Sequence, residues 1–196
     1  MKDGRLAVVH DSNLKRLTGK DVIVENLFSN DLISYPLIID GQIILTLDEV
    51  LSLINGRVPL LIELKFNDKF NYTQADALLS LLKDYEYKDM IALQSFNYRA
   101  VKYLKRKINE YSVGFLSSYR LKNKSRILNY LLKSLKLYNY MHADFISYDI
   151  RFLPNKYVSS KRKNNEQLLT WTINTMQKLE IANFESDNII FEKIEI

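Results

Sequence analysis

Cysteine is absent from this 196-residue sequence, and histidine is nearly absent, with only His10 and His142 present. The lack of cysteine excludes disulfides, catalysis by a thiolate and a zinc site built on cysteine. With only two histidines, any metal site has to rest mainly on carboxylates, which favour hard cations such as Mg²⁺ and Ca²⁺. Glycine and proline are also scarce, at 5 and 3 residues, which excludes collagen-like and linker-like sequence.

No apolar run approaches the roughly 18 residues that a transmembrane helix needs, and residues 1–5 contain no stretch typical of a signal peptide. As the sequence stands we expect a cytoplasmic chain, while a longer parent protein would be free to be membrane-anchored or extracellular. The hydrophobic fraction is 47% and the net charge is +5, as in a soluble globular protein. Because no linker, composition shift or long repeat interrupts it, residues 1–196 are predicted to form a single domain.

The positive charge is concentrated in three short basic clusters. They are Lys102, Lys105, Arg106 and Lys107; Lys122, Lys124 and Arg126; and Lys161, Arg162 and Lys163. Such clusters are one signature of nucleic-acid binding. The first two, however, alternate with apolar residues at helical spacing, which is typical of the solvated face of an amphipathic helix. We therefore expect no nucleic-acid partner, and weak binding to anionic surfaces or nucleic acid is kept as a less favoured alternative.

Short apolar runs alternate with longer stretches of helical periodicity, which predicts strands alternating with helices. The predicted strands are Leu6–His10, Leu60–Lys65, Met90–Ser95, Tyr111–Leu116, Asp144–Tyr148, Leu168–Asn174 and Asn188–Phe191. The predicted helices are Leu47–Leu53, Tyr72–Tyr85, Tyr98–Asn109, Lys124–Met141, Asn155–Lys161 and Thr175–Ala182. Two helices begin at pairs that form a capping box, Thr46 with Glu49 and Asn71 with Gln74.

This alternation of strand and helix predicts a parallel sheet, either open or closed into a barrel. No glycine-rich turn follows the first predicted strand, which argues against an open dinucleotide-binding sheet. A complete (β/α)8 barrel typically needs roughly 250 residues, about one strand-helix-strand unit more than this chain has. We therefore predict an α/β fold, a (β/α)8 TIM-type barrel that lacks its first strand-helix unit and the start of the second strand.

In such a barrel the functional residues collect at the carboxyl ends of the strands. The first candidate is His10, which closes the predicted strand Leu6–His10 and is followed by Asp11. Histidine titrates near neutral pH and transfers protons, and a neighbouring carboxylate can orient its ring. A purely structural histidine is the alternative.

The second candidate is the pair Glu63 and Lys65, two residues apart on one face of an otherwise apolar strand. A carboxylate inside a barrel is costly unless a cation or strong donors meet it. A metal ion would explain Glu63, with Lys65 left to face an anionic group such as a phosphate. A buried Glu63–Lys65 ion pair with only structural meaning explains the two residues equally well.

The third candidate is Trp171, the only tryptophan, in the predicted strand Leu168–Asn174. It fits the wall of a pocket mouth or the ordinary barrel core equally well. His142, by contrast, precedes the predicted strand Asp144–Tyr148, which places it at the opposite end of the barrel and outside catalysis.

The order of the motifs resembles the glycerophosphodiester phosphodiesterase family over essentially the whole chain. The matching segments are Asp3–Asp11, Leu14–Gly19, Leu45–Leu51, Leu61–Lys65, Gln94–Phe96, Trp171–Asn174 and Asp187–Ile190. The resemblance implies a barrel that hydrolyses a glycerophosphodiester to an alcohol and glycerol 3-phosphate, with a divalent cation and two histidines as general acid and base. It also implies that His10 is one catalytic histidine, Glu63 a metal ligand and Lys65 a basic residue near the phosphate, with Trp171 in the substrate-binding motif.

The same resemblance shows what the sequence lacks. In the family a His-Arg pair, an Asn-Thr motif and a Glu-x-Asp pair of metal ligands precede the turn that is here Asp3-Gly4, and none of them is present. We therefore expect Ca²⁺ or Mg²⁺ to be bound weakly if at all, and hydrolysis of the small-molecule glycerophosphodiester substrate to be impaired. A catalytically silent remnant or interaction module of the same fold is the alternative. An open barrel edge also predicts self-association.

Overall fold

The computed structural model describes residues 1–66, 70–120 and 125–195, and the chain divides into two compact units. The N-terminal unit consists of Met1–Pro59 and Phe66–Met90. The sheet unit consists of Leu60–Lys65 and Ile91–Ile196.

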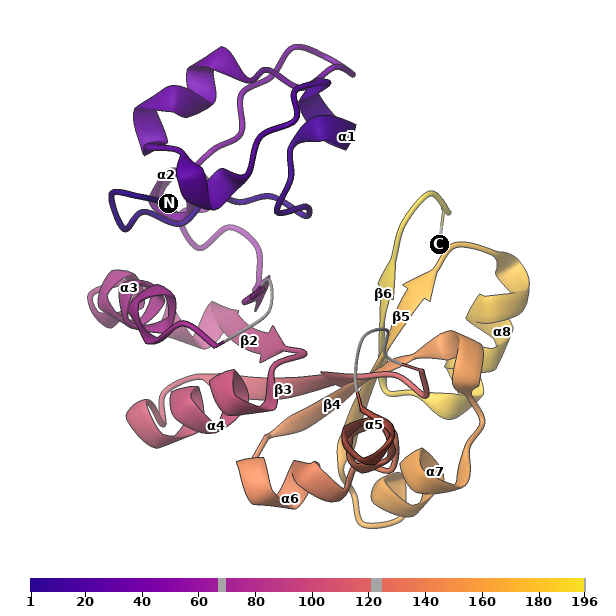
Figure 1. Cartoon of the computed structure of the whole chain (residues 1–196). Helices are drawn as coiled ribbons and strands as arrows, with labels where there is room; N and C mark the ends of the chain where they lie inside the picture. The colour runs from indigo at the N-terminus through magenta and orange to yellow at the C-terminus, as the bar shows by residue number, and fades with distance from the viewer. Residues whose placement is uncertain (67–69, 121–124, 196) are drawn as a thin grey trace. The chain divides into compact units, whose positions relative to one another are not determined.

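The N-terminal unit is made of short helices and irregular segments around a small apolar core. Its elements are α1 (Lys15–Thr18), η1 (Val24–Asn26), η2 (Ser29–Ser34), α2 (Leu47–Ile54), α3 (Tyr72–Lys83) and η3 (Lys88–Met90), where η marks a 3-10 helix (Figure 1). The core residues are Leu14, Val24, Leu27, Leu32 and Ile44. Helix α2 begins at the predicted capping box, because the backbone N–H and the hydroxyl of Thr46 both donate to Glu49 Oε2 at 2.7 Å.

The predicted strand Leu6–His10 is wrong. Among the described residues of this segment, Ala7 alone makes a bridge, a single antiparallel one with Thr46. Ala7 and Val9 pack against the small core of the N-terminal unit, and His10 lies on an exposed bend. The alternation of apolar residues therefore reflects half-burial against this core rather than pairing in a sheet.

The sheet unit is built on parallel strands that lie side by side in the order in which they occur in the chain (Figure 1). The strands are β1 (Leu60–Glu63), β2 (Ile91–Ser95), β3 (Ser112–Ser117), β4 (Phe145–Asp149), β5 (Gln167–Ile173) and β6 (Asn188–Phe191). The helices are α4 (Tyr98–Lys107), α5 (Arg126–Lys133), α6 (Lys136–Met141), η4 (Ile150–Phe152), α7 (Lys156–Arg162) and α8 (Met176–Glu185). The predicted strands from Leu60 onward are confirmed, with ends that shift by at most two residues.

The register shows which side chains share a face of the sheet. The aligned pairs are Glu63–Gln94, Gln94–Gly114, Leu116–Ser147, Ser147–Leu169 and Asp149–Trp171. Because aligned residues of neighbouring strands and residues i and i+2 of one strand point the same way, all of these side chains lie on one face. We call it the inner face.

The opposite face of the sheet is covered by helices. Ser117 Oγ donates to the carbonyl of Leu132 at 2.9 Å, and the Tyr148 hydroxyl donates to that of Lys133 at 3.2 Å, so both side chains point toward α5. Helix α4 packs against β2 and β3, with Val101 and Leu104 fully buried. The larger apolar core of the sheet unit therefore lies between the sheet and its helices, while the inner face carries polar side chains beside buried apolar ones such as Leu116 and Phe145.

The predicted helix Lys124–Met141 is wrong in its continuity, because it is interrupted between α5 and α6. Leu135 adopts a left-handed backbone conformation, with φ of 56°. Leu132, Leu135 and Tyr138 are all buried, so both short helices turn their apolar residues to the same core. Lys122 and Lys124 of the second basic cluster lie outside the described residues.

The longest helix in the described ranges is α3, with 12 residues, and none of these helices is long and apolar enough to cross a membrane.

Candidate active site

Glu63 and Lys65 lie at the carboxyl end of β1, the end at which parallel barrels place their chemistry. Lys65 Nζ is 3.8 Å from Glu63 Oε2, and the two side chains are 36% and 27% exposed. The pair is therefore accessible from solvent rather than sealed in a core, which fits a binding site better than the buried structural ion pair.

The next strand supplies the segment Gln94-Ser95-Phe96. Ser95 Oγ donates to the carbonyl of Leu64 at 2.7 Å and accepts from the backbone N–H of Asn97 at 3.1 Å. This buried hydroxyl therefore links Leu64, which lies between Glu63 and Lys65, to Asn97 at the start of α4. Phe96 meets Trp171 edge to face, with ring centroids 5.4 Å apart, so the two aromatic side chains pack together near the carboxyl end of β5.

Three buried side-chain polar atoms have no hydrogen-bond partner in the described part of the chain: Gln94 Oε1, Ser147 Oγ and Trp171 Nε1. The register places all three residues on the inner face. A buried polar atom without a partner costs about 1–3 kcal/mol unless water or a ligand satisfies it. One acceptor, one hydroxyl and one N–H donor thus make this face suited to a polar ligand.

Asp149 and Arg151, at the end of β4, form a charged pair that the sequence analysis missed. Asp149 is 1% exposed and accepts hydrogen bonds from Ser118 Oγ at 2.9 Å and from the Arg151 backbone N–H at 3.1 Å. Arg151 Nη2 and Nε reach its carboxylate at 2.6 and 2.9 Å. Burial raises the pKa of Asp149, but the donors of Arg151 and Ser118 outweigh it and hold the pKa below its usual value. The signal for the pair was an acid directly after a buried strand.

His10 belongs to the N-terminal unit, and its side chain is 75% exposed. Its Nδ1 lies 2.7 Å from Asp11 Oδ1, so the neighbouring carboxylate does orient the ring. Arg16 Nε donates to the other oxygen of Asp11 at 2.6 Å, and the hydrogen bonds from Arg16 and His10 lower the pKa of Asp11 to about 2. That His10 acts together with Glu63 and Lys65 stays a prediction.

The amino ends of the strands carry a different set of residues. His142 follows α6 and precedes β4, so it lies at the amino ends of the strands, opposite Glu63, as predicted.

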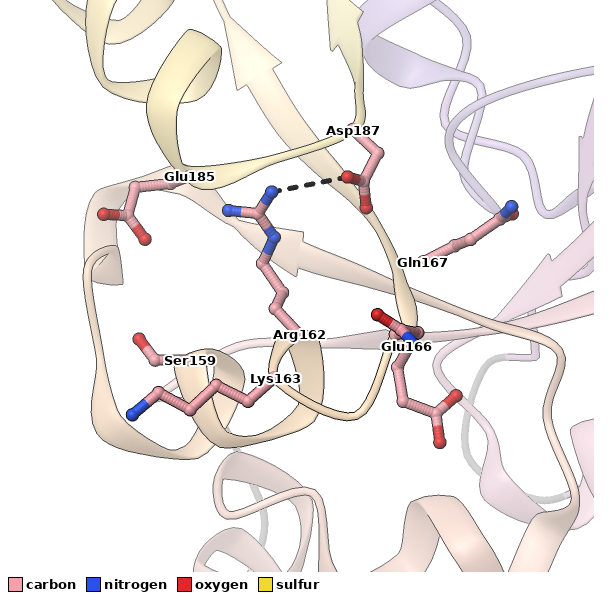
Figure 2. A pocket seen from close by; sticks show the side chains of 8 residues that line it. Ser159, Arg162, Lys163, Glu166, Gln167, Glu185 and Asp187 are labelled. Atoms are coloured by element: carbon pink, nitrogen blue, oxygen red, sulfur yellow. Dashed lines mark hydrogen bonds and ion pairs between the residues drawn. The ribbon is translucent and has the colours of Figure 1, made fainter.

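A cavity of about 630 Å³ lies beside the first residue of β5. Figure 2 shows Arg162 directed at Asp187 at the side of this cavity, and their nearest side-chain atoms are 3.3 Å apart. Asp187 also accepts from the backbone N–H of Leu168 at 2.7 Å, so this pair ties β5 to β6. In barrels this end of the strands generally serves stability.

A divalent cation does not fit the residues in the described ranges. They contain no group of three or more histidine, aspartate or glutamate side chains able to hold a metal ion. Ca²⁺ takes 6–8 oxygen ligands and Mg²⁺ requires near-ideal octahedral coordination, whereas Glu63 stands beside an ammonium group. Among the described residues, one carboxylate beside an ammonium group at β1 suits an anion better than a divalent cation.

A parallel α/β sheet with charged and aromatic side chains at its carboxyl edge is the arrangement in which barrel enzymes place their active sites. The sequence profile of the Glycerophosphoryl diester phosphodiesterase family matches residues 1–194, and the chain belongs to that family. This confirms the family prediction, and the chain is by family a hydrolase of phosphoric diesters.

Individual relatives agree with the family assignment. The glycerophosphodiester phosphodiesterase of Caldanaerobacter subterraneus subsp. tengcongensis is 25% identical over 186 residues, which cover 91% of this chain and 72% of the relative. A phosphodiesterase of Oleispira antarctica, solved with the product sn-glycerol-3-phosphate, has a TM-score of 0.76 at 22% identity, covering 97% of this chain and 76% of its own. The Thermotoga maritima glycerophosphodiester phosphodiesterase has a TM-score of 0.72 at 24% identity with the same coverage. The α/β barrel class is thereby confirmed, with six parallel strands curled into part of a barrel.

Proposed function

We propose that this chain binds glycerophosphodiesters at the carboxyl edge of the inner face and hydrolyses them poorly by itself. The observation that carries the proposal is the Lys65–Glu63 pair: an accessible ammonium group beside one carboxylate, on a face with unpaired polar atoms. A phosphodiester is an anion, and an ammonium group at the end of a strand is a suitable partner for it. The family supports the substrate class, as does the sn-glycerol-3-phosphate complex of the Oleispira antarctica phosphodiesterase.

Each predicted site residue has a role in this proposal. Lys65 donates to a phosphoryl oxygen, and Glu63 holds the ammonium group and accepts from a glycerol hydroxyl. Trp171 lines the pocket, with its indole N–H available to the substrate. His10 transfers a proton to or from the reacting oxygen, and Asp11 keeps its ring oriented.

Poor hydrolysis follows from the donor set. The alkoxide that leaves a phosphodiester is a poor leaving group, so charge must be absorbed at the phosphate and a proton supplied to the departing oxygen. Loss of one general acid or base typically lowers the rate by about 10²–10⁴-fold. Because the described residues contain no group of three or more metal ligands, we expect Ca²⁺ or Mg²⁺ to bind weakly if at all and to change turnover little.

The same donor set supports a second candidate function, a binding module that retains the ligand but performs no reaction. The two candidates share the site and differ in turnover alone. The basic-surface alternative differs from both, because it predicts binding that depends on salt and not on Lys65.

Calorimetric titration with glycerol 3-phosphate tests the proposal. We expect wild-type chain to bind in EDTA, Lys65→Gln to bind about tenfold more weakly, and Lys163→Gln, at the opposite edge of the sheet, to bind like wild type. Hydrolysis of glycerophosphocholine, followed in parallel with Mg²⁺, Ca²⁺ or EDTA, separates a slow enzyme from a silent module. Equal binding by Lys65→Gln refutes the site. Rapid turnover that requires the metal ion would show that the donor set has been misjudged.

A further inference from the structure

We propose that Arg151, fixed by Asp149, selects glycerophosphodiesters whose alcohol carries additional negative charge over those with a cationic alcohol such as choline. The inference rests on the proposed function and adds to it the substrate class. It concerns a cluster that we call the cationic corner: Arg151, Lys133, Tyr119 and Phe152, with Asp149 behind them.

The first step is the way in which Arg151 is held. Asp149 is buried and already accepts from Ser118 Oγ and from a backbone N–H, yet Nε and Nη2 of Arg151 also bind its carboxylate. The guanidinium fork is thereby fixed in orientation, while the Arg151 side chain stays 64% exposed. These contacts direct the two N–H groups of Nη1 away from Asp149. Asp149 is a positioning residue, and Arg151 is an oriented donor facing solvent.

The second step is the location of Arg151. Asp149 ends β4 on the inner face, aligned with Trp171, so it shares the carboxyl edge with Glu63 and Lys65. Three strand spacings separate β1 from β4, which is about 14 Å along the sheet at about 4.8 Å per strand. Because the fork is tied to Asp149 on β4, we place it beside the part of the substrate that Lys65 does not hold. It faces the alcohol half of the substrate instead.

The third step is the charge around the corner. The rings of Tyr119 and Phe152 stack at 5.6 Å, and Tyr119 is 38% exposed. Lys133 Nζ lies 4.2 Å from the Tyr119 centroid, and Arg151 Cζ lies 5.6 Å from that of Phe152. An accessible aromatic ring normally attracts an ammonium ligand, but cations of the chain already lie over the exposed Tyr119 ring and the half-buried Phe152 ring. A choline group is therefore repelled, whereas a second phosphate gains charge-assisted hydrogen bonds.

The test measures a ratio of affinities in the full chain. Glycerophosphoinositol 4-phosphate carries an extra phosphate, glycerophosphocholine carries an ammonium group, and glycerol 3-phosphate reports on Lys65 alone. We expect wild-type chain to bind the first at least about tenfold more tightly than the second. Arg151→Gln should bring this ratio to within about threefold of one and leave glycerol 3-phosphate binding unchanged. Arg106→Gln, on an exposed helix end at the other edge of the sheet, is the matched control and should keep the wild-type ratio.

The outcomes separate the inference from the proposed function. If wild-type chain binds glycerol 3-phosphate but shows no preference, or if Arg151→Gln keeps the preference, the inference is overturned and the proposed function stands. If wild-type chain binds none of the three compounds, the proposed function fails and takes the inference with it. Arg151→Lys keeps the positive charge but not the guanidinium fork, so this variant should retain part of the affinity ratio. If Arg151 acted only by holding the structure together, its charge would not be expected to preserve the ratio. Should Arg151→Gln fail to fold, Lys133→Gln tests the same corner, and an unchanged ratio in that variant also refutes the inference.

Discussion

Gly114, in the middle of β3, is the position at which one added methyl group should disturb the sheet most sharply. A Cβ atom at Gly114 would lie 2.0, 2.2 and 2.6 Å from Cε2, Cζ and Cδ2 of Phe145, its aligned neighbour on β4. Carbon atoms normally approach to about 3.5–4.0 Å, so the ring has to move by about 1.5 Å. Phe145 is 5% exposed, which leaves the ring little room.

The sign of the effect makes Gly114→Ala a strict test. Gly114 does not have a positive φ, so alanine fits its backbone, and without the ring the substitution would stabilise the strand by about 0.5–1 kcal/mol. Overpacking typically costs 1–3 kcal/mol. We expect a net loss of about 1–2 kcal/mol in urea unfolding, equivalent to a fall in Tm of about 2–8 °C at this chain length.

A double-mutant cycle with Phe145→Ala identifies the cause. With the ring removed, Gly114→Ala should be neutral or stabilising, which gives a coupling energy of about 1–3 kcal/mol between the two sites. The reasoning is refuted if Gly114→Ala is as stable as wild type while Phe145 is present. It is also refuted if the loss persists in the Phe145→Ala background, because the ring would then not be its source.

Three further predictions concern a helix cap, a carboxylate and the sheet edges. Asn97 Oδ1 accepts from the first backbone N–H groups of α4, so Asn97→Ala should lower the free energy of unfolding by about 1 kcal/mol, and an unchanged urea midpoint would contradict this. Because the pKa of Asp11 is lowered to about 2, its ionised carboxylate should stabilise the folded chain above pH ~4, and this contribution should be lost as the pH falls through 2. Asp11→Asn should therefore flatten the dependence of the free energy of unfolding on pH in this range. An NMR titration that places the pKa of Asp11 near its usual value would disprove the prediction. Because β1 and β6 are the end strands of the sheet, the chain should self-associate with rising concentration in sedimentation velocity, and a strictly monomeric species would rule out this contact.

Most of the sheet could be predicted because its central strands β2, β3 and β4 are buried over most of their length, which produces short runs rich in apolar residues such as Val113–Leu116. The same appearance was misleading at Leu6–His10, where a loop half-buried on a small core produces a similar pattern without a partner strand. The interruption at Leu135 was also hidden. No glycine or proline marks it, and apolar periodicity continues through it because α5 and α6 face one core.

The site was predicted in part. Strand alternation placed Glu63 and Lys65 together, and the structure shows them as an ion pair. Trp171 was open to two interpretations, and its edge-to-face contact with Phe96 is compatible with both. Asp149 was missed because the predicted strand ended one residue earlier, at Tyr148. The sequence shows that Asp149 follows an apolar strand, but it does not show that the Asp149 side chain points to the inner face and binds Arg151.

The strand order of the sheet has a consequence for how the protein is made. Each strand pairs with the one translated just before it, so the sheet can grow by one strand and helix at a time as the chain leaves the ribosome. No strand of the described sheet has to wait for a partner from a later part of the sheet, because each pairing spans only the connection between two successive strands. If the ribosome pauses between two helices of the sheet unit, the strands already translated can form a smaller paired sheet. Ribosome-bound chains of increasing length should therefore become more resistant to protease in steps, one step for each added strand.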